Sequence, residues 1–67
     1  MPPLRRFAAR LRKLREKRGM TQEQLAQRAR VSRVYVTLIE TKRADPRLSI
    51  AVKLAKALRV SISELID

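Results

Sequence analysis

The sequence contains neither cysteine nor histidine. Disulfide bonds, thiolate chemistry and the usual zinc ligands are therefore excluded. Six carboxylate side chains are present, and their positions suggest no acid–base pair and no activated nucleophile. We therefore expect that the chain is not an enzyme and that it binds no metal, no cofactor and no small-molecule ligand.

Long apolar runs are also missing. No stretch approaches the roughly 20 apolar residues of a membrane-spanning helix, and no short apolar segment with a small-residue cleavage site marks the start as a secretion signal. We therefore expect no membrane span and a cytoplasmic location. Aromatic rings are limited to Phe7 and Tyr35, which counts against binding of single strands by base stacking.

Positive charge is abundant. Seventeen Lys and Arg residues stand against six Asp and Glu residues, which gives a formal net charge of +11. A small domain this basic is usually matched electrostatically to a polyanion. Nucleic acid is the first candidate partner, and an anionic membrane surface is the second.

The chain has the length of a single domain, covering residues 1–67. Two prolines within residues 1–3 prevent a helix there, so we expect a short flexible arm. Apolar residues then recur at three- and four-residue steps, at Leu4, Phe7, Leu11 and Leu14. This spacing predicts an amphipathic helix, which Gly19 is expected to end in the left-handed conformation.

Residues 21–41 predict two short helices joined by a tight turn. Thr21 and Gln24 have the spacing of a capping box, and Ser32 is a second N-cap after the apolar pattern breaks. Two helices with so short a turn must cross steeply, which is the geometry of a helix-turn-helix whose second helix enters the DNA major groove. The residues expected to point outward from that second helix are Arg33, Val34, Thr37, Leu38 and Thr41.

The rest of the sequence predicts a polar loop over residues 42–47, an amphipathic helix over residues 48–58 and a last short turn. Ser61 and Glu64 have the spacing of another capping box. The expected fold is all-α, a compact bundle of five helices without strands. The expected core consists of Phe7, Leu11, Leu14, Leu25, Ala29, Val31, Val36, Ile39, Leu48, Leu54, Leu58, Val60, Ile62 and Leu65.

Several motifs at fixed spacings occur together between about Leu11 and Leu65. They are Leu14-Arg15, Gly19-Met20-Thr21-Gln22-Glu23-Gln24-Leu25-Ala26, Val31-Ser32-Arg33, Ile39-Glu40, Pro46, and Leu54-Ala55-Lys56-Ala57-Leu58 followed by Val60-Ser61. With these motifs the chain resembles the phage-repressor and Cro type of helix-turn-helix DNA-binding domain, the Xre-like family. The resemblance implies a five-helix bundle of the lambda-repressor-like type, in which the third helix is the recognition helix.

The resemblance also implies DNA-contacting roles for single residues. Arg33, Val34 and Leu38 match positions that read bases, and Gln22 matches a position that contacts phosphate and sometimes a base. The positions that grip the DNA backbone are Thr37, Thr41, Lys42 and Arg43. Thr21, which caps the second helix, completes the expected set of DNA-binding residues together with Tyr35.

The chemistry of these residues suggests what each contributes. Arg33 is expected to bind guanine O6 and N7, whereas Val34 and Leu38 favour thymine methyl groups. Tyr35 has two interpretations: its hydroxyl donates to a phosphate, or its ring packs beneath the second helix. The basic residues on the outer face of the first helix likewise either contact phosphates or form a solvated surface.

A buried ion pair between Arg15 and Glu40 is a further implication of the resemblance. It would tie the first helix to the end of the third. Glu40 directly follows the core residue Ile39, and a buried carboxylate is costly unless it is paired. The alternative is an exposed Glu40 without a partner.

Three positions depart from the family pattern. Arg30, Lys42 and Arg59 stand where the family usually has glycine. Either the local turns differ, or the chain tolerates left-handed residues that each cost about 1 kcal/mol. Our hypothesis is that Arg30 and Lys42 accept a strained backbone conformation because their positive charges attract DNA phosphates.

We expect a sequence-specific, double-stranded DNA-binding transcriptional regulator. One recognition helix covers few base pairs, so a homodimer on a palindromic operator is expected. Ile62, Leu65 and Ile66 are either the dimer interface or core. Two other functions stay open: a protein-interaction module of the same fold, as in antitoxins and coactivators, and a membrane-active cationic peptide based on the first helix.

Overall fold

Five α-helices make up the chain in the computed structural model, which describes the backbone of residues 4–66 and the side chains of residues 6–66. They are α1 (Leu4–Lys17), α2 (Gln22–Ala29), α3 (Arg33–Glu40), α4 (Leu48–Leu58) and α5 (Ser63–Ile66). No strand occurs within residues 4–66, so the predicted all-α, five-helix fold is confirmed. The predicted arm at residues 1–3 lies outside the described residues.

Local capping sets the boundaries of the two central helices. The Thr21 hydroxyl accepts a hydrogen bond from the Gln24 amide at 3.1 Å, and the Gln24 side chain accepts one from the Thr21 amide at 2.9 Å. Ser32 caps α3 by accepting from the Tyr35 amide at 3.0 Å. Each bond satisfies an amide that has no partner within its helix. Gly19 follows α1 in the left-handed conformation with φ 69°, as predicted.

The second predicted capping box forms only in part. The Ser61 amide donates to the Glu64 carboxylate at 3.3 Å. However, the Ser61 hydroxyl is hydrogen-bonded to the Ser63 hydroxyl at 2.9 Å, and the Glu64 amide donates to the Ser61 carbonyl instead. The four-residue α5 therefore starts in a tighter turn than a full capping box gives.

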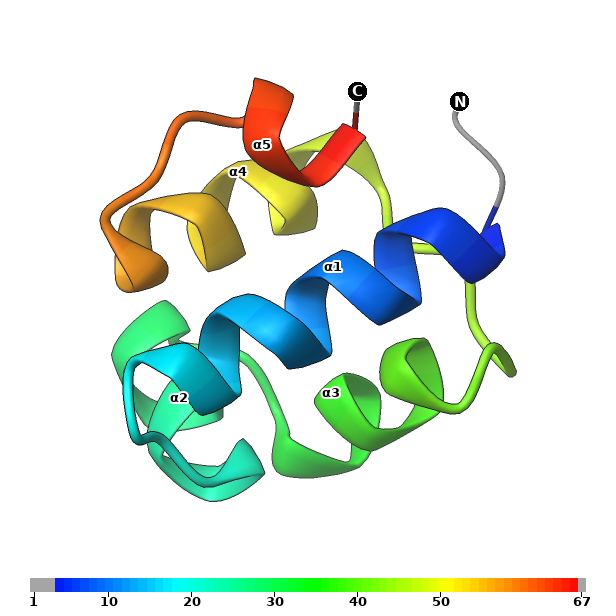
Figure 1. Cartoon of the computed structure of the whole chain (residues 1–67). Helices are drawn as coiled ribbons and strands as arrows, with labels where there is room; N and C mark the ends of the chain where they lie inside the picture. Colours follow the sequence, from blue (N-terminus) through cyan, green and yellow to red (C-terminus); the bar gives the residue numbers. More distant parts are fainter. Residues whose placement is uncertain (1–3, 67) are drawn as a thin grey trace.

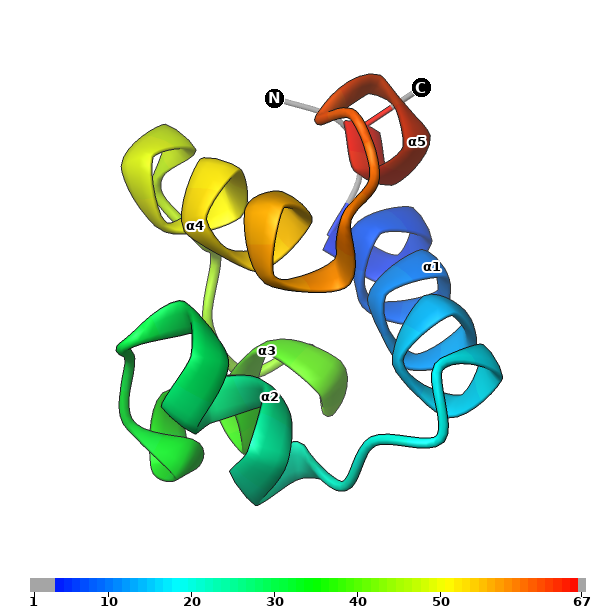
Figure 2. The ribbon, with the colours of Figure 1, turned by 90° about the vertical axis from the view of Figure 1, so that its left-hand side faces the viewer.

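Each of the helices α1 and α2 packs against two other helices. In the view of Figure 1, α1 runs across the front of the molecule, with α4 and α5 above it and α2 and α3 below it. α2 packs against both α3 and α4, while α1 packs against α3 and α5. The view in Figure 2 shows α2 and α3 crossing steeply below α4. The helix-turn-helix geometry inferred from the short connection is therefore present.

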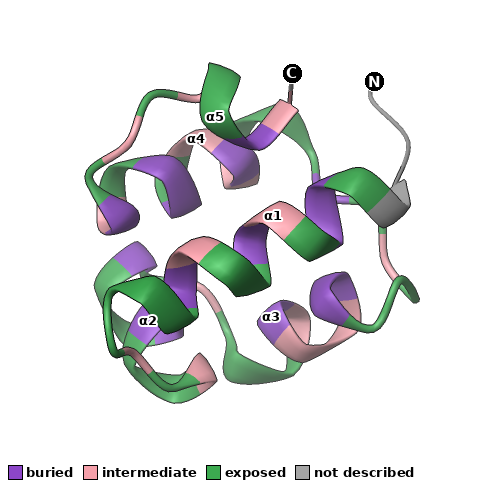
Figure 3. Cartoon of the chain, viewed as in Figure 1, coloured by how far each residue is buried: buried purple, intermediate pink, exposed green. Residues whose placement is uncertain are grey.

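The core lies where these helices meet (Figure 3). Its buried apolar residues are Phe7, Ala8, Leu11, Leu25, Ala26, Ala29, Val36, Ile39, Ala51, Leu54, Ala55, Leu58 and Leu65. Leu14, Val31, Val60 and Ile62, which were predicted as core, are partly buried against it. Leu65 is fully buried, so it belongs to the core. The alternative that Leu65 forms part of a dimer interface is therefore wrong.

Leu48 was predicted as core and is exposed over 62% of its surface. It is the first residue of α4, and side chains in a helix lean toward its N-terminus. The Leu48 side chain therefore leans past the end of the helix rather than over the core. Pro46, two residues earlier, is buried.

Three residues other than glycine have left-handed backbone conformations. Arg30 has φ 58°, Lys42 has φ 65° and Arg59 has φ 58°. The amide after Arg30 donates to the Ala26 carbonyl at 3.0 Å, which closes the helix end as a glycine would. The sequence left two alternatives for these positions: turns that differ from those of the family, or left-handed residues other than glycine. The structure shows the second alternative.

A buried ion pair joins α1 to the end of α3. Arg15 Nε donates to Glu40 Oε2 at 2.8 Å, and the Arg15 Nη2 donates to Glu40 Oε1 at 3.0 Å. The third nitrogen, Nη1, donates to the Met20 carbonyl at 2.8 Å. The hydrogen bond with Glu40 raises the pKa of Arg15 above its ordinary value, although burial opposes this change. The guanidinium therefore stays charged and fully engaged.

The substitution Glu40→Ala is expected to lower the free energy of unfolding by about 3–5 kcal/mol, because it leaves the Arg15 charge buried without its partner. Urea denaturation followed by circular dichroism measures the change. Glu16→Ala is the matched control, since Glu16 pairs with Arg12 at 3.3 Å on the surface and should cost about 0.5 kcal/mol or less. Equal losses in the two variants would contradict a structural role for the buried pair.

The substitution Arg30→Gly is expected to raise the free energy of unfolding by about 1 kcal/mol, because glycine adopts the left-handed conformation without a Cβ penalty. Arg30→Ala serves as control: it removes the same exposed side chain but keeps the Cβ atom. Thermal melts of the two variants compare them directly. A gain shared equally by glycine and alanine would assign the effect to the lost charge instead of the backbone.

Candidate nucleic-acid interface

One side of α3 faces away from the core. Its other side carries Val36, Ile39 and Glu40, which are buried. At the start of the helix, Arg33 is exposed and Val34 is exposed over 63% of its surface. Further along the same outward side, Thr41 is exposed, while Thr37 and Leu38 are partly buried. The five residues predicted to point outward thus share one surface, which we call the α3 face.

Gln22, at the start of α2, is held against the α3 face by two hydrogen bonds. Its Nε2 atom donates to Glu40 Oε1 at 3.0 Å, and its Oε1 atom accepts from the Thr37 hydroxyl at 2.8 Å. Glu40 Oε1 also accepts from Arg15. A continuous set of hydrogen bonds therefore runs from Arg15 in α1 through Glu40 and Gln22 to Thr37.

Of this set of bonds, only the pair between Arg15 and Glu40 was predicted from the sequence, where Gln22 was expected to contact DNA. A glutamine at the start of one helix and a glutamate at the end of the next give no periodic signal of contact. The bonds depend on how α2 crosses α3, which is a tertiary property.

The two remaining threonines make local hydrogen bonds. The Thr41 hydroxyl lies 2.8 Å from the Thr37 carbonyl and 3.3 Å from the Leu38 carbonyl, one turn back in the same helix. Thr21 is exposed, and its hydroxyl accepts the capping bond from Gln24. Both hydroxyl groups are therefore fixed in place by bonds within their own part of the chain.

Tyr35 lies partly buried against the core. Its hydroxyl donates to the Asp45 carbonyl in the loop before α4, at 3.4 Å. Of the two interpretations of Tyr35, the one in which its ring packs against the body of the molecule agrees with this burial. Its hydroxyl contacts the loop before α4. At 3.4 Å the bond is long for a hydroxyl donor, so the hydroxyl is weakly held.

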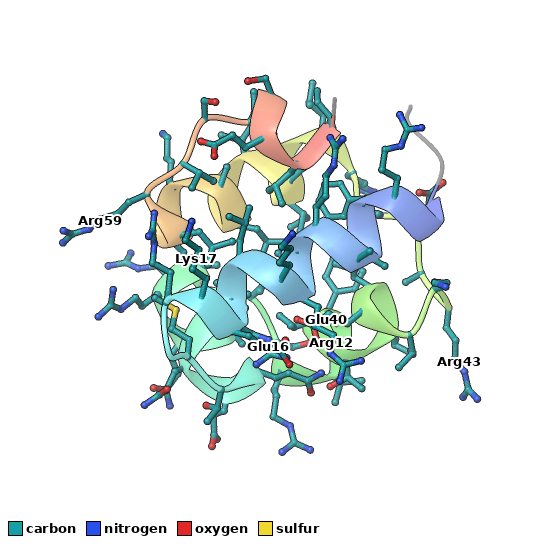
Figure 4. The ribbon with its side chains drawn as sticks, in the orientation of Figure 1. Arg12, Glu16, Lys17, Glu40, Arg43 and Arg59 are labelled. Carbon is teal, nitrogen blue, oxygen red and sulfur yellow. The ribbon has the colours of Figure 1, made fainter. Side chains whose placement is uncertain are left out.

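Lys42 and Arg43 extend the α3 face at the end of the helix. The Arg43 and Ala44 amides both donate to the Leu38 carbonyl, at 2.8 and 3.2 Å, which folds the loop back onto α3. Both basic side chains are exposed, and Arg43 points away from the body of the molecule (Figure 4). The α3 face is thus flanked by Gln22 on one side and by two cations at its end.

The chemistry of this face suits hydrogen bonding and charge pairing rather than catalysis. The carboxylate of Glu40 lies behind this face, buried and hydrogen-bonded to Arg15 and Gln22. Among the described residues, no group of three or more carboxylates is placed to hold a metal ion. Within the same part of the chain, no helix combines the length and apolarity needed to cross a membrane.

Known proteins of similar sequence cover most of the chain. Residues 11–65 match the family model described as helix-turn-helix. An uncharacterised HTH-type transcriptional regulator from Archaeoglobus fulgidus is 38% identical over 56 residues, which make up 84% of this chain and 80% of that protein. The immunity repressor protein of Bacillus phage phi105 is 39% identical over 57 residues, or 85% of this chain and 40% of the repressor.

A solved structure of similar fold supports the same assignment. The restriction-modification controller protein C.AhdI from Aeromonas hydrophila is 39% identical, with a TM-score of 0.90, over 92% of this chain and 94% of that one. The resemblance to phage repressors that the motifs indicated is confirmed by these matches. The chain therefore belongs to the helix-turn-helix family of transcriptional regulators.

Proposed function

We propose that this chain is a sequence-specific regulator of transcription that binds double-stranded DNA with α3 in the major groove. The observation that carries the proposal is the α3 face, where an arginine and an exposed valine open a helix that the core holds from behind. An α-helix fits the major groove, where each base pair presents a distinct pattern of donors and acceptors. The family to which the chain belongs supports this function.

Binding would have two components. Lys42 and Arg43 neutralise phosphates and release counterions, which gives affinity that depends on salt and little on sequence. Arg33 then reads a guanine, while Val34 and Leu38 contact thymine methyl groups. The exposed position of Arg33 and Val34 at the first turn of α3 favours this division of roles.

The polar residues beside α3 would fix the register on the DNA backbone. Gln22 uses one N–H in its bond with Glu40, so its second N–H is available for a phosphate. In this proposal the hydroxyl groups of Thr21, Thr37 and Thr41 also contact the DNA backbone. Tyr35 reaches a phosphate by releasing its long bond to the Asp45 carbonyl.

A homodimer on a palindromic operator completes the proposal. One domain of this size offers one recognition helix, and two half-sites about one helical turn apart multiply its specificity. Ile62 and Ile66 are partly buried at the α5 surface, and both are candidates for the interface. The single domain acts in the cytoplasm in this proposal, with DNA as its ligand and no small-molecule effector.

Arg33→Ala is expected to weaken binding to the preferred duplex more than to an unrelated duplex. The preferred sequence comes first, from selection on random duplex DNA at two salt concentrations. A bidentate arginine–guanine pair provides about 1–3 kcal/mol of discrimination, so the affinity ratio between the two duplexes should fall by that amount. Fluorescence anisotropy at constant salt measures both affinities.

Arg43→Ala is the matched control, because it removes one exposed cation from the end of the same face. It should weaken both duplexes equally and reduce the salt slope by about 0.9. If Arg33→Ala behaves like Arg43→Ala, Arg33 is a backbone contact. If neither variant changes DNA affinity, the protein-interaction alternative for this fold is favoured.

The homodimer is tested by sedimentation. We expect the weight-average mass to approach twice the 7.8 kDa of one chain as the concentration rises, and the preferred duplex to bind two chains. Ile66→Gln should shift the dimer toward monomer by weakening an apolar interface, and Leu48→Gln is the exposed apolar control. A single-chain mass at all concentrations, with one chain bound per duplex, would rule out the dimer.

A further inference from the structure

A second basic surface lies on the opposite side of α2 from α3. It is formed by the end of α1, the end of α2 and the outer side of α4. Its six basic residues are Arg18, Arg28, Arg30, Lys53, Lys56 and Arg59, all of them exposed. We call it the α2–α4 basic face. None of these residues belongs to the α3 face described above.

Two hollows in this surface adjoin one another at Arg28. The first, of about 760 Å³, is lined by Arg18, Gly19, Met20, Gln24, Gln27, Arg28 and Arg59. The second, of about 410 Å³, is lined by Arg28, Ala29, Arg30, Lys53, Lys56 and Ala57. Because Arg28 lines both, the six cations form one surface rather than two separate sites.

Among the side chains of residues 6–66, the cations of this face have no carboxylate partners. The ion pairs found among residues 6–66 involve Arg12 and Arg15, and no acidic residue lines either hollow. Arg18 uses its Nε atom to donate to the Leu58 carbonyl at 2.9 Å, which fixes the side chain and leaves its two terminal nitrogens for a ligand. The face therefore offers positive charge that no carboxylate of the described residues compensates, with one of its side chains, Arg18, held in place.

The position of the face separates it from the proposed recognition surface. α2 packs against both α3 and α4, and in Figure 2 α3 lies behind α2 while α4 lies above it. In Figure 4, Arg59 and Arg43 point away from opposite sides of the molecule. The molecule measures 25 × 22 × 20 Å between Cα atoms, whereas DNA is stiff over about 150 base pairs. A short duplex seated on α3 therefore does not also reach the α2–α4 basic face.

We propose that the α2–α4 basic face binds the backbone phosphates of a second DNA duplex, so that the protein can bridge two duplexes. Arginine forks bind phosphate oxygens in bidentate pairs. An acidic protein partner is disfavoured, because protein interfaces are anchored by large apolar or aromatic side chains. The apolar residues lining these hollows are Met20, Ala29 and Ala57, of which Ala29 is buried and the others partly buried.

The experiment captures a second duplex in trans. A duplex of about 20 base pairs, which holds two half-sites one turn apart, carries the preferred sequence and is tethered to a surface. The protein is bound to it, and a labelled duplex of the same length and unrelated sequence is added at several salt concentrations. We expect the wild-type protein to capture the labelled duplex with a steep dependence on salt.

The decisive comparison is between two double variants of equal charge. Arg28→Gln with Lys56→Gln removes two cations from the face, and the salt slope of capture should fall by about 1.8. Arg10→Gln with Lys13→Gln removes two cations from a different hollow, which also contains Glu64, and the slope should not change. Circular dichroism checks that both variants melt like the wild type.

Three results would overturn the proposal. The first is no capture by the wild-type protein while it occupies the tethered duplex. The second is an equal loss in both double variants, which would show that net charge alone attracts the second duplex. The third is undiminished capture by the Arg28 and Lys56 variant, which would indicate bridging through the second recognition helix of a dimer.

Failure of the proposed function gives a different result. In that case the tethered duplex itself is not bound in preference to an unrelated one, before any second duplex is added. The basic face is then tested in solution at low salt, on one unrelated duplex. A larger loss of affinity in the Arg28 and Lys56 variant than in the Arg10 and Lys13 variant would still support it, and equal losses would refute it.

Discussion

The carboxylate of Glu40 joins three helices at one buried point. It accepts two hydrogen bonds from Arg15 in α1 and one from Gln22 in α2, while Glu40 itself belongs to α3. An isolated helix of eight residues is marginal in water, so α3 owes its existence and its orientation to such contacts. Val36 and Ile39 hold it by burial, which has no preferred direction. The directional bonds at Glu40 fix its rotation, and hence which residues form the α3 face.

How much the sequence could predict depends on how local the determining interaction is. The ends of α2 and α3 follow from Thr21 and Ser32, whose caps act within three residues, and the fold class follows from apolar spacing. Regulators rather than enzymes make up the family, so the expectation that the chain is not an enzyme is also confirmed. The bond from Gln22 to Glu40 escaped prediction, because it depends on the crossing of two helices. Leu48 was misplaced because periodicity ignores the tilt of side chains at a helix end.

Three basic residues of this chain have left-handed backbone conformations. Arg30, Lys42 and Arg59 each occupy a conformation that glycine would adopt more easily. At about 1 kcal/mol each, the three together cost a substantial part of the stability that a small domain has. Lys42 lies beside the α3 face, whereas Arg30 and Arg59 lie on the α2–α4 basic face. The strain is thus spread over both of the surfaces proposed to meet phosphates.

A net charge of +11 on 67 residues has a consequence for specificity. Phosphate contacts raise the affinity for every duplex, so they do not raise the ratio between the preferred site and all others. In the proposed function that ratio comes from Arg33, Val34 and Leu38. Such contacts each contribute a few kcal/mol at most, and the competing sites of a genome are very numerous. Because a second half-site doubles the discriminating free energy without adding a new kind of contact, the homodimer of the proposed function would supply the specificity that three base-reading residues on so charged a protein would not reach alone.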